Sequence, residues 1–507
     1  MSTITRRAVL GALITAVLVT TGCGTRIERA DILAAEGHSA AAPAEVAVND
    51  TAPVSAVALP ASDGTTPVAA PAQAPAVVSR STASPSPAAS GGTAAVPAGT
   101  PRAANTATTS AAAGTTSPAV ASAPAPGAAG PKGCAKAGSP IVIGQVGGFS
   151  GIVSNVLLPA RAGMQVWVSD INARGGIACH PVKLFQVDDG SDSSRSAAAV
   201  RDLVENKKVV ALVGSSVPIS IVGYRSASEQ LKVPSVGGDS LNFDWSQSPV
   251  LFPQGATFSA TIIGAVKQLA DQGKTKAGII YCVEARNCQD ANKVMADGGD
   301  KVAGVNVVYR SQISIAQTGF GGQCQAAKDA GAQQVLLAMD GSAISRVMKS
   351  CAQIDYFPAI ATSPIAIGSS VTQDPNVRKA TVSLAHIAFP WTQADNPAEQ
   401  RYQQAMARYA PGVASDGATS QAWVAGEMLR SAIESLGAGD AAAGDVTTEL
   451  IYRGLGNLKG TTLDGLTAPL TFTAGQAKAP ENNCYFPVML TQDKGFVAPD
   501  GSKPTCL

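Results

Sequence analysis

Short apolar runs alternate with helical stretches from about residue 139 to the end of the chain. The clearest runs are Ile141–Gly144, Val182–Phe185, Val209–Gly214, Ala277–Tyr281, Val305–Tyr309, Gln334–Met339, Ala359–Ala361 and Leu384–Phe389. Strand, helix and strand in repeated succession are typical of parallel sheets whose two faces are covered by helices. The pattern therefore predicts an α/β protein.

The stretch after the first apolar run shows the helical signal most clearly. Apolar residues recur there at intervals of three and four, at Met164, Trp167, Val168 and Ile171. This spacing predicts one buried face of an amphipathic helix. The pair Gly175–Gly176 then predicts a left-handed turn that ends the helix.

The first residues of the chain have the composition of an export signal. Arg6 and Arg7 precede an apolar run from Ala8 to Val19, and small residues lead to Cys23. The run is too short to span a bilayer as a mature helix, so residues 1–23 are predicted to be a secretory signal. The Gly22-Cys23 junction resembles a bacterial lipobox, although Thr20 stands where that pattern prefers leucine. Cys23 is therefore the predicted lipid acceptor, and the general and twin-arginine export routes both stay open.

Residues 24–133 are dominated by Ala, Pro, Ser, Thr and Gly, with almost no aromatic residues. Such a segment cannot bury enough apolar surface to offset its ordering entropy. It is predicted to be a disordered tether, and residues 134–507 to be the folded region.

The charges nearly cancel, with 37 basic and 36 acidic residues and a formal net charge of +1. This balance argues against a nucleic-acid partner and against attraction to anionic lipid, so membrane attachment would come from the lipid on Cys23. Removing Cys23 from the nine cysteines leaves eight, which suits four disulfides in an exported protein. Their spacing fits no zinc site, and eight cysteines allow about 105 connectivities, so the sequence alone does not choose among them.

Four motifs carry a family resemblance. They read SDINARGGI at 169–177, DDGSD at 188–192, VALVG at 210–214 and VPSVGGDS at 233–240. Together they resemble the type I periplasmic binding proteins of the branched-chain amino-acid family, which are the extracytoplasmic substrate-binding subunits of ABC importers. The resemblance covers essentially the whole folded region.

The resemblance implies two doubly wound parallel-sheet lobes joined by three crossovers, with a small-molecule ligand between them. One lobe would hold residues 139–253 and 388–468, and the other 254–387 and 469–507. It implies a membrane permease as partner, no cofactor and no catalysis. Proximity within this fold favours four disulfide pairs, Cys134–Cys179, Cys282–Cys288, Cys324–Cys351 and Cys484–Cys506.

Candidate ligand-binding residues follow the strands, because ligands of open α/β sheets bind outside the carboxyl ends of the strands. The candidates are Ser150, Ser216 (or Ser220), Asp239, Ser240, Glu284, Arg286, Asp340, Ser363 and Trp391. Members of the family hold an amino-acid carboxylate at the loops that match Ser216 and the Asp239-Ser240 pair. Ser216 can equally be a helix cap.

The departures from the family pattern bear on the ligand. Val156, Arg286 and Asp340 stand where aromatic side chains commonly line the cleft, and Ser363 stands near the carboxylate that grips the ligand's ammonium group. We therefore expect leucine, isoleucine and valine to bind weakly. Asp340 or Glu284 could hold an ammonium group instead, and Arg286 a carboxylate.

Each of these assignments has a structural alternative. Glu284 and Arg286 can be a solvated pair inside a short disulfide loop, and Trp391 can pack at a hinge rather than stack on a ligand. Asp188, Asp189 and Asp192 suit helix capping better than a metal site.

The chain is interpreted as a lipid-anchored, extracytoplasmic binding protein that captures a small polar solute such as an amino acid or amide and presents it to a permease. The alternative is a ligand-sensing receptor lipoprotein of the same fold. An enzymatic role has little support, because the histidines His38, His180 and His386 accompany no nucleophile elbow.

Overall fold

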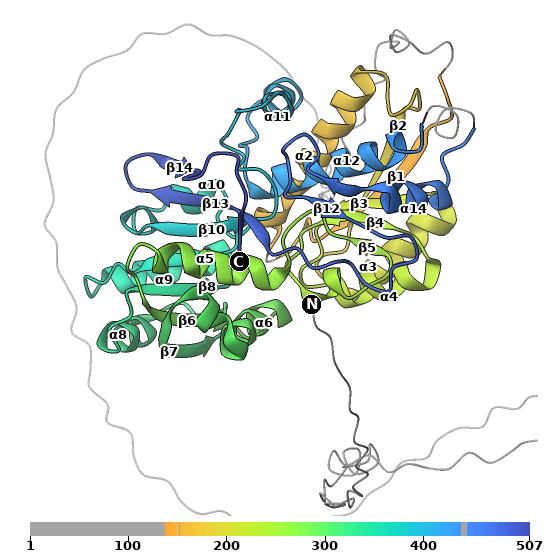
Figure 1. The fold of residues 1–507 in the computed structure, drawn as a ribbon. Helices are drawn as coiled ribbons and strands as arrows, with labels where there is room; N and C mark the ends of the chain where they lie inside the picture. The colour runs from red at the N-terminus through yellow and green to blue at the C-terminus, as the bar shows by residue number, and fades with distance from the viewer. Residues whose placement is uncertain (1–136, 152, 438–443) are drawn as a thin grey trace, which may run out of the picture. The chain divides into compact units, whose positions relative to one another are not determined.

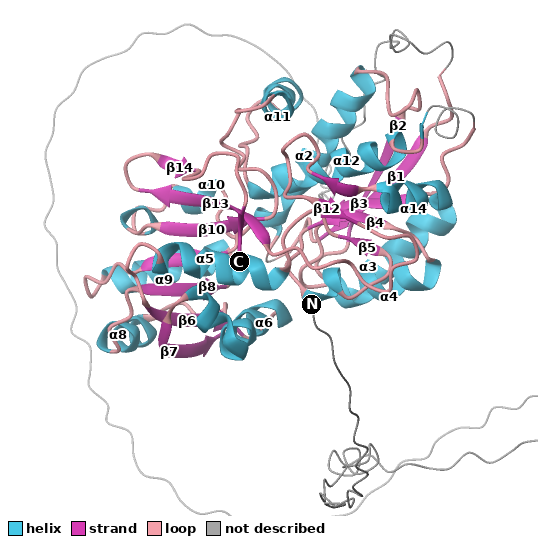
Figure 2. Cartoon of the chain, in the orientation of Figure 1, coloured by secondary structure: helices cyan, strands magenta, loops and turns pink. Residues whose placement is uncertain are grey.

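The computed structural model describes residues 137–151, 153–437 and 444–507. The predicted signal, the lipid acceptor Cys23, the tether and Cys134 lie outside these residues. Two mainly parallel sheets organise the described chain, and helices flank both of them (Figures 1 and 2). The predicted α/β class is confirmed.

The first sheet has five strands in the order β2-β1-β3-β4-β5, all parallel. Its strands are β1 (Ile141–Gly147), β2 (Val182–Asp188), β3 (Ala211–Ser215), β4 (Ser235–Gly238) and β5 (Leu251–Phe252). This order is that of a doubly wound sheet, in which the direction of winding reverses beside the first strand.

Successive residues of β3 show that helices cover both faces of this sheet. Ala211 and Val213 belong to the buried cluster of α2 (Ser154–Ala173) and α12 (Gly417–Glu434). Leu212, between them, packs in the cluster of α3 (Ser193–Arg201) and α4 (Ile221–Leu231). Alternation of this kind follows from the two-residue period of a strand.

Helix α2 has the predicted buried face. Met164, Trp167 and Ile171 are buried, whereas Val168 is only half-buried. Gly175 and Gly176 follow with φ of 107° and 81°, the left-handed conformation that the sequence predicts after the helix.

The second sheet has eight strands, with the path β14-β13-β10-β9-β8-β6-β7 and with β15 paired to β13. Its strands are β6 (Lys276–Cys282), β7 (Asn306–Ile313), β8 (Gln334–Ala338), β9 (Ala359–Thr362), β10 (Val382–His386), β13 (Cys484–Thr491), β14 (Gly495–Val497) and β15 (Thr505–Cys506). Strands β6 to β10 are parallel, and β13 runs antiparallel to β10. The C-terminal strands thus complete a sheet that begins more than two hundred residues earlier.

The other α-helices and a small separate pair of strands lie around these two sheets (Figure 1). They are α5 (Phe258–Ala270), α6 (Arg286–Val294), α7 (Asp300–Ala303), α8 (Gly321–Asp329), α9 (Gly341–Ala352), α10 (Ser369–Thr372), α11 (Pro397–Tyr409), α14 (Thr448–Asn457) and the small pair β11 (Lys459–Thr461) and β12 (Leu470–Thr471). Within the described ranges, each helix is too short or too polar to cross a membrane.

We call residues 141–252 and 397–471 the first lobe, and residues 258–386 and 484–506 the second lobe. The chain passes between them after β5, after β10 and after β12. These passages are the three crossovers that the resemblance implies. The residues at which each lobe begins and ends stay a proposal.

Three of the four disulfide pairs implied by the resemblance are confirmed. Cys282–Cys288 joins β6 to α6, Cys324–Cys351 joins α8 to α9, and Cys484–Cys506 joins β13 to β15. Cys179 is also disulfide-bonded. Its predicted partner Cys134 lies outside the described residues, so that pairing stays a prediction.

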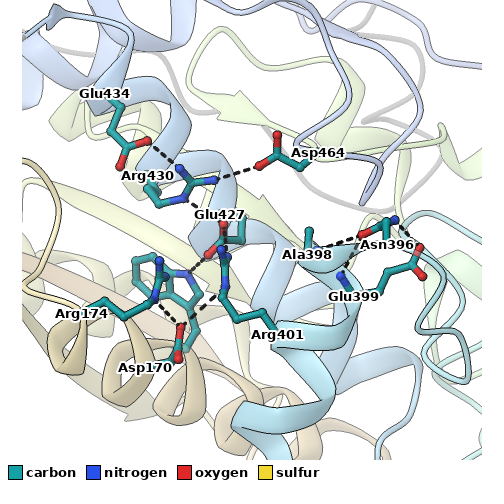
Figure 3. A network of polar contacts seen from close by, with 11 residues as sticks. Asp170, Arg174, Asn396, Ala398, Glu399, Arg401, Glu427, Arg430, Glu434 and Asp464 are labelled. Carbon is teal, nitrogen blue, oxygen red and sulfur yellow. Dashed lines mark hydrogen bonds and ion pairs between the residues drawn. The ribbon is translucent and has the colours of Figure 1, made fainter.

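A buried carboxylate ties α12 to α2 and α11 (Figure 3). Glu427 has a side chain only 1% exposed, pairs with Arg401 and Arg430, and accepts a hydrogen bond from Trp167 Nε1 at 2.9 Å. Burial opposes its ionisation, but the two guanidinium groups lower the pKa of Glu427 below its usual value. The ion pairs therefore stabilise the helix layer of the first lobe.

Candidate functional site

A cavity of about 180 Å³ lies between the two lobes. Its first-lobe wall comes from the segments after β1, β3 and β4, and its second-lobe wall mainly from α5 and from the segments after β6, β8 and β9. These segments follow the carboxyl ends of parallel strands, where open α/β sheets bind their ligands. The cavity is therefore the candidate ligand site.

Most of the lining is apolar. The first lobe contributes Val153, Val156, Leu157, Pro218, Ile219 and Leu241. The second lobe contributes apolar side chains that include Phe258, Ile262, Ile315, Met339 and Ile365. A ligand with a substantial hydrocarbon surface would gain about 25 cal/mol for each Å² that it buries here.

Two threonine hydroxyls in the lining are already used as donors. Thr261 Oγ1 donates to the Phe258 carbonyl, and Thr362 Oγ1 donates to the Leu337 carbonyl, each at 2.8 Å. These hydroxyls therefore keep only acceptor lone pairs for a ligand.

Glu284 lines the cavity just after β6. Its Oε1 accepts hydrogen bonds from the Ser314 hydroxyl and from the Ile315 N–H, the latter at 3.0 Å. Burial acts to raise the pKa of Glu284, but these hydrogen bonds lower it below its usual value. The side chain is therefore an anion at neutral pH.

Asp340 and Ser363 line the same cavity after β8 and β9. Asp340 caps α9, because its Oδ1 accepts from the N–H groups of Ser342 and Ala343 at 2.9 and 3.2 Å. Ser363 Oγ accepts from the Ile365 N–H at 3.3 Å. The structure thus brings Glu284, Asp340 and Ser363 together, whereas the other sequence-predicted candidates lie outside the lining.

Arg286 turns away from the cavity, although its neighbours Ala285 and Asn287 line it. It forms ion pairs with Asp244 in the first lobe and with Asp290 on its own helix, the second at 3.4 Å. Glu284 and Arg286 therefore have separate partners.

Asp239 and Ser240 are buried beside the cavity. Asp239 accepts hydrogen bonds from Val217 N, Leu241 N and Trp245 Nε1 at 2.6, 2.9 and 3.2 Å. Burial raises the pKa of Asp239 to about 6, although the hydrogen bonds from these donors act to lower it. Ser240 has a φ of 52°, and its buried hydroxyl has no hydrogen-bond partner within the described structure.

Ser150 and Ser216 belong to the first-lobe loops. Ser150 is exposed, and its N–H donates to Asp188 Oδ1 at 3.1 Å. Ser216 is buried, and its N–H donates to the Val146 carbonyl at 2.9 Å. These contacts are made by the backbone, so a binding role for either side chain stays a prediction.

Trp391 is only 2% exposed. Its ring meets His386 and Phe496 edge-on, with centroids 5.2 and 5.0 Å apart. These contacts are those of a packing residue beside the second crossover, as in the hinge alternative.

The aspartates that follow β2 cap a helix and join two loops. Asp192 caps α3 by accepting from Arg195 N at 2.8 Å, as the sequence predicts. Asp189 accepts from Ser220 Oγ at 2.6 Å, which joins this loop to the start of α4.

Sequence reasoning missed the apolar lining. Ile219, Phe258, Ile315 and Met339 have the local signature of core residues, and no spacing marks them as cavity walls. Their one sequence signal is a position close to the end of a strand or the start of a helix.

The two doubly wound lobes and the cavity between them match one family. A family model described as periplasmic binding protein matches residues 140–494. The chain belongs to this family of periplasmic binding proteins. Its sheet order and crossovers are those of the type I, branched-chain amino-acid group that the motifs resemble.

Solved structures of other periplasmic binding proteins share this fold. A possible leucine/isoleucine/valine-binding protein from Rhodopirellula baltica SH 1 is 15% identical, with a TM-score of 0.62 over 72% of this chain and 98% of that one. A fatty acid ABC transporter substrate-binding protein from Thermomonospora curvata is 18% identical, with a TM-score of 0.58 over 73% and 93% of the two chains.

A third structure is an ABC transporter solute-binding protein from R. palustris in complex with benzoate. It is 14% identical, with a TM-score of 0.57 over 72% of this periplasmic binding protein and 96% of that chain. A search of curated proteins finds no match to the sequence.

Proposed function

We propose that this periplasmic binding protein is the extracytoplasmic substrate-binding component of an ABC importer. The observation that carries the proposal is the cavity lined by both lobes, because a solute held there contacts both and favours their closed arrangement. The family is one of binding proteins, and two of the similar structures are ABC transporter components.

The lining favours a more apolar solute than the small polar one that the sequence predicts. The walls are mostly hydrocarbon, with a few polar groups in the second lobe, which suits a solute with an apolar body and one polar end. Val156 on the first-lobe wall and Ser363 on the second support the expectation that leucine, isoleucine and valine bind weakly.

A thermal-shift screen of the purified protein tests solute binding. The library should include amino acids, amides, aromatic and aliphatic acids, amines and sugars. A ligand present at a hundred times its dissociation constant should stabilise the fold by about 2.7 kcal/mol. Absence of any shift across the library would contradict the proposal.

Uptake measurements separate import from the sensing alternative. Deleting the gene should abolish high-affinity uptake of the ligand found in the screen, and restoring it should recover uptake. A receptor that only reports the ligand to a signalling partner would leave uptake unchanged.

A further inference from the structure

The polar groups that line the cavity are mostly acceptors. Glu284 and Asp340 contribute carboxylates, each with one oxygen engaged by hydrogen bonds from the protein. A ligand that brings hydrogen-bond donors can use the carboxylate oxygens that remain free.

The lining also lacks positive charge. Among the described residues that line the cavity there is no Lys, Arg or His. The closest basic residue in sequence, Arg286, is paired with Asp244 and Asp290. A ligand carboxylate would therefore meet two carboxylates of the protein with no cation to offset them.

The two carboxylates come from neighbouring strands. Tyr281 on β6 pairs in register with Ala338 on β8, and Glu284 and Asp340 follow these residues at the same edge of the sheet. The exposed Glu284 carboxylate is held by Ser314 and Ile315 after β7, whereas Asp340 caps α9, so the two carboxylates contribute negative charge from separate places in the lining.

The volume of the cavity accommodates a compact apolar body. An apolar cavity of about 150 Å³ holds a benzene molecule. The cavity between the lobes, at about 180 Å³, has room for a body of that size with a small substituent.

We propose that the cavity binds an amphiphilic amine, that is, a compact aromatic or aliphatic body whose protonated amino group is attracted by the carboxylates of Glu284 and Asp340. The inference rests on the proposed solute-binding function and names the class of its ligand. It excludes carboxylates as preferred ligands, so benzoate and fatty acids are not expected to bind here.

Calorimetric titration of the wild-type protein with benzylamine, benzyl alcohol and benzoate tests the inference, because these probes share a ring and differ in charge. Benzylamine should bind at least about tenfold more tightly than benzyl alcohol, since a charge-assisted hydrogen bond contributes more than a neutral one. Benzoate should show no measurable binding. Equal affinities, or tighter binding of benzoate, would overturn the inference and leave the solute-binding proposal standing.

Two variants test the residues. Glu284→Gln and Asp340→Asn should each weaken benzylamine binding about tenfold and leave benzyl alcohol nearly unaffected. Asparagine can also cap a helix, so the start of α9 is expected to persist. Asp297→Asn, an exposed position in an ion pair with Lys293, is the matched control and should change nothing.

The outcomes separate the two proposals. If other solutes stabilise the protein and benzylamine does not bind, the amine inference fails alone. If no solute in the screen binds, both proposals fail. Should either carboxylate variant fail to fold, the comparison of the three probes on the wild-type protein still decides.

Discussion

Arg286 at the start of α6 in the second lobe forms an ion pair with Asp244, which lies between β4 and β5 in the first lobe. Asp244 Oδ1 also accepts a hydrogen bond from Arg225 Nη1 at 3.1 Å, and the Asp244 side chain is only 7% exposed. The pair therefore links the two lobes beside the cavity and stabilises the arrangement in which the structure shows them.

Replacing Arg286 should weaken this link between the lobes. Arg286 is half exposed, so its pair with Asp244 contributes about 1 kcal/mol. We expect Arg286→Gln to increase the ligand dissociation rate roughly fivefold, measured by stopped-flow fluorescence, with little effect on association. Lys293→Gln removes an exposed pair on the same helix and serves as the control. Equal dissociation rates in Arg286→Gln and wild type would show that the pair does not hold the lobes.

The Glu427 network should be essential for stability. Glu427→Gln leaves two guanidinium groups without their buried partner, so the free energy of unfolding should fall by about 3 kcal/mol in urea denaturation. The control is Glu434→Gln on the same helix, whose 45% exposed carboxylate pairs with Arg430 and should contribute less than about 1 kcal/mol. Similar losses in both variants would refute a special role for Glu427.

His386 should make stability depend on pH. Burial lowers the pKa of His386 to about 3, whereas an unfolded histidine titrates near about 6.5. Between these two pH values the unfolded chain binds a proton on this histidine and the folded chain does not. The contribution of His386 to the free energy of unfolding is therefore fully present above about pH 6.5 and declines as the pH falls. The wild type should lose about 2 kcal/mol relative to His386→Gln between pH 7.5 and 5. Parallel stability curves for the two proteins would contradict this.

The Cys282–Cys288 disulfide should shape the cavity. It flanks the segment that carries Glu284 and Asn287, so its replacement by alanines should lower ligand affinity about tenfold and stability by about 2 kcal/mol. Alanines at Cys484 and Cys506, neither of which lines the cavity, should lower stability and leave affinity unchanged. Mass spectrometry of unreduced digests would verify both bridges in the wild type.

Attachment to the membrane should depend on Cys23. Cys23→Ser removes the predicted acceptor of the lipid, so the protein should leave the membrane fraction and appear in the soluble one. A folded, ligand-binding domain in the released protein is the necessary control. Retention of the variant in membranes would defeat the lipoprotein prediction.

Much of the fold could be predicted because its signals are local. The alternating runs predicted parallel sheets, the spacing of Met164, Trp167 and Ile171 predicted the buried face of α2, and Asp192 was expected as a cap. Each property depends on neighbours within a few residues. The disulfide pairs needed the resemblance as well, since spacing alone leaves their connectivity open.

Local patterns were enough to identify which loops follow the strands, and so which residues could border a ligand. The packing of the lobes is what places Glu284 and Asp340 in the cavity lining while Arg286 pairs with Asp244. The apolar walls were equally hidden, because Ile219 and Ile315 have the same local pattern whether they face a packed core or an open space. A cavity arises where two lobes meet, and that meeting joins residues far apart in the chain, beyond the range of any local pattern.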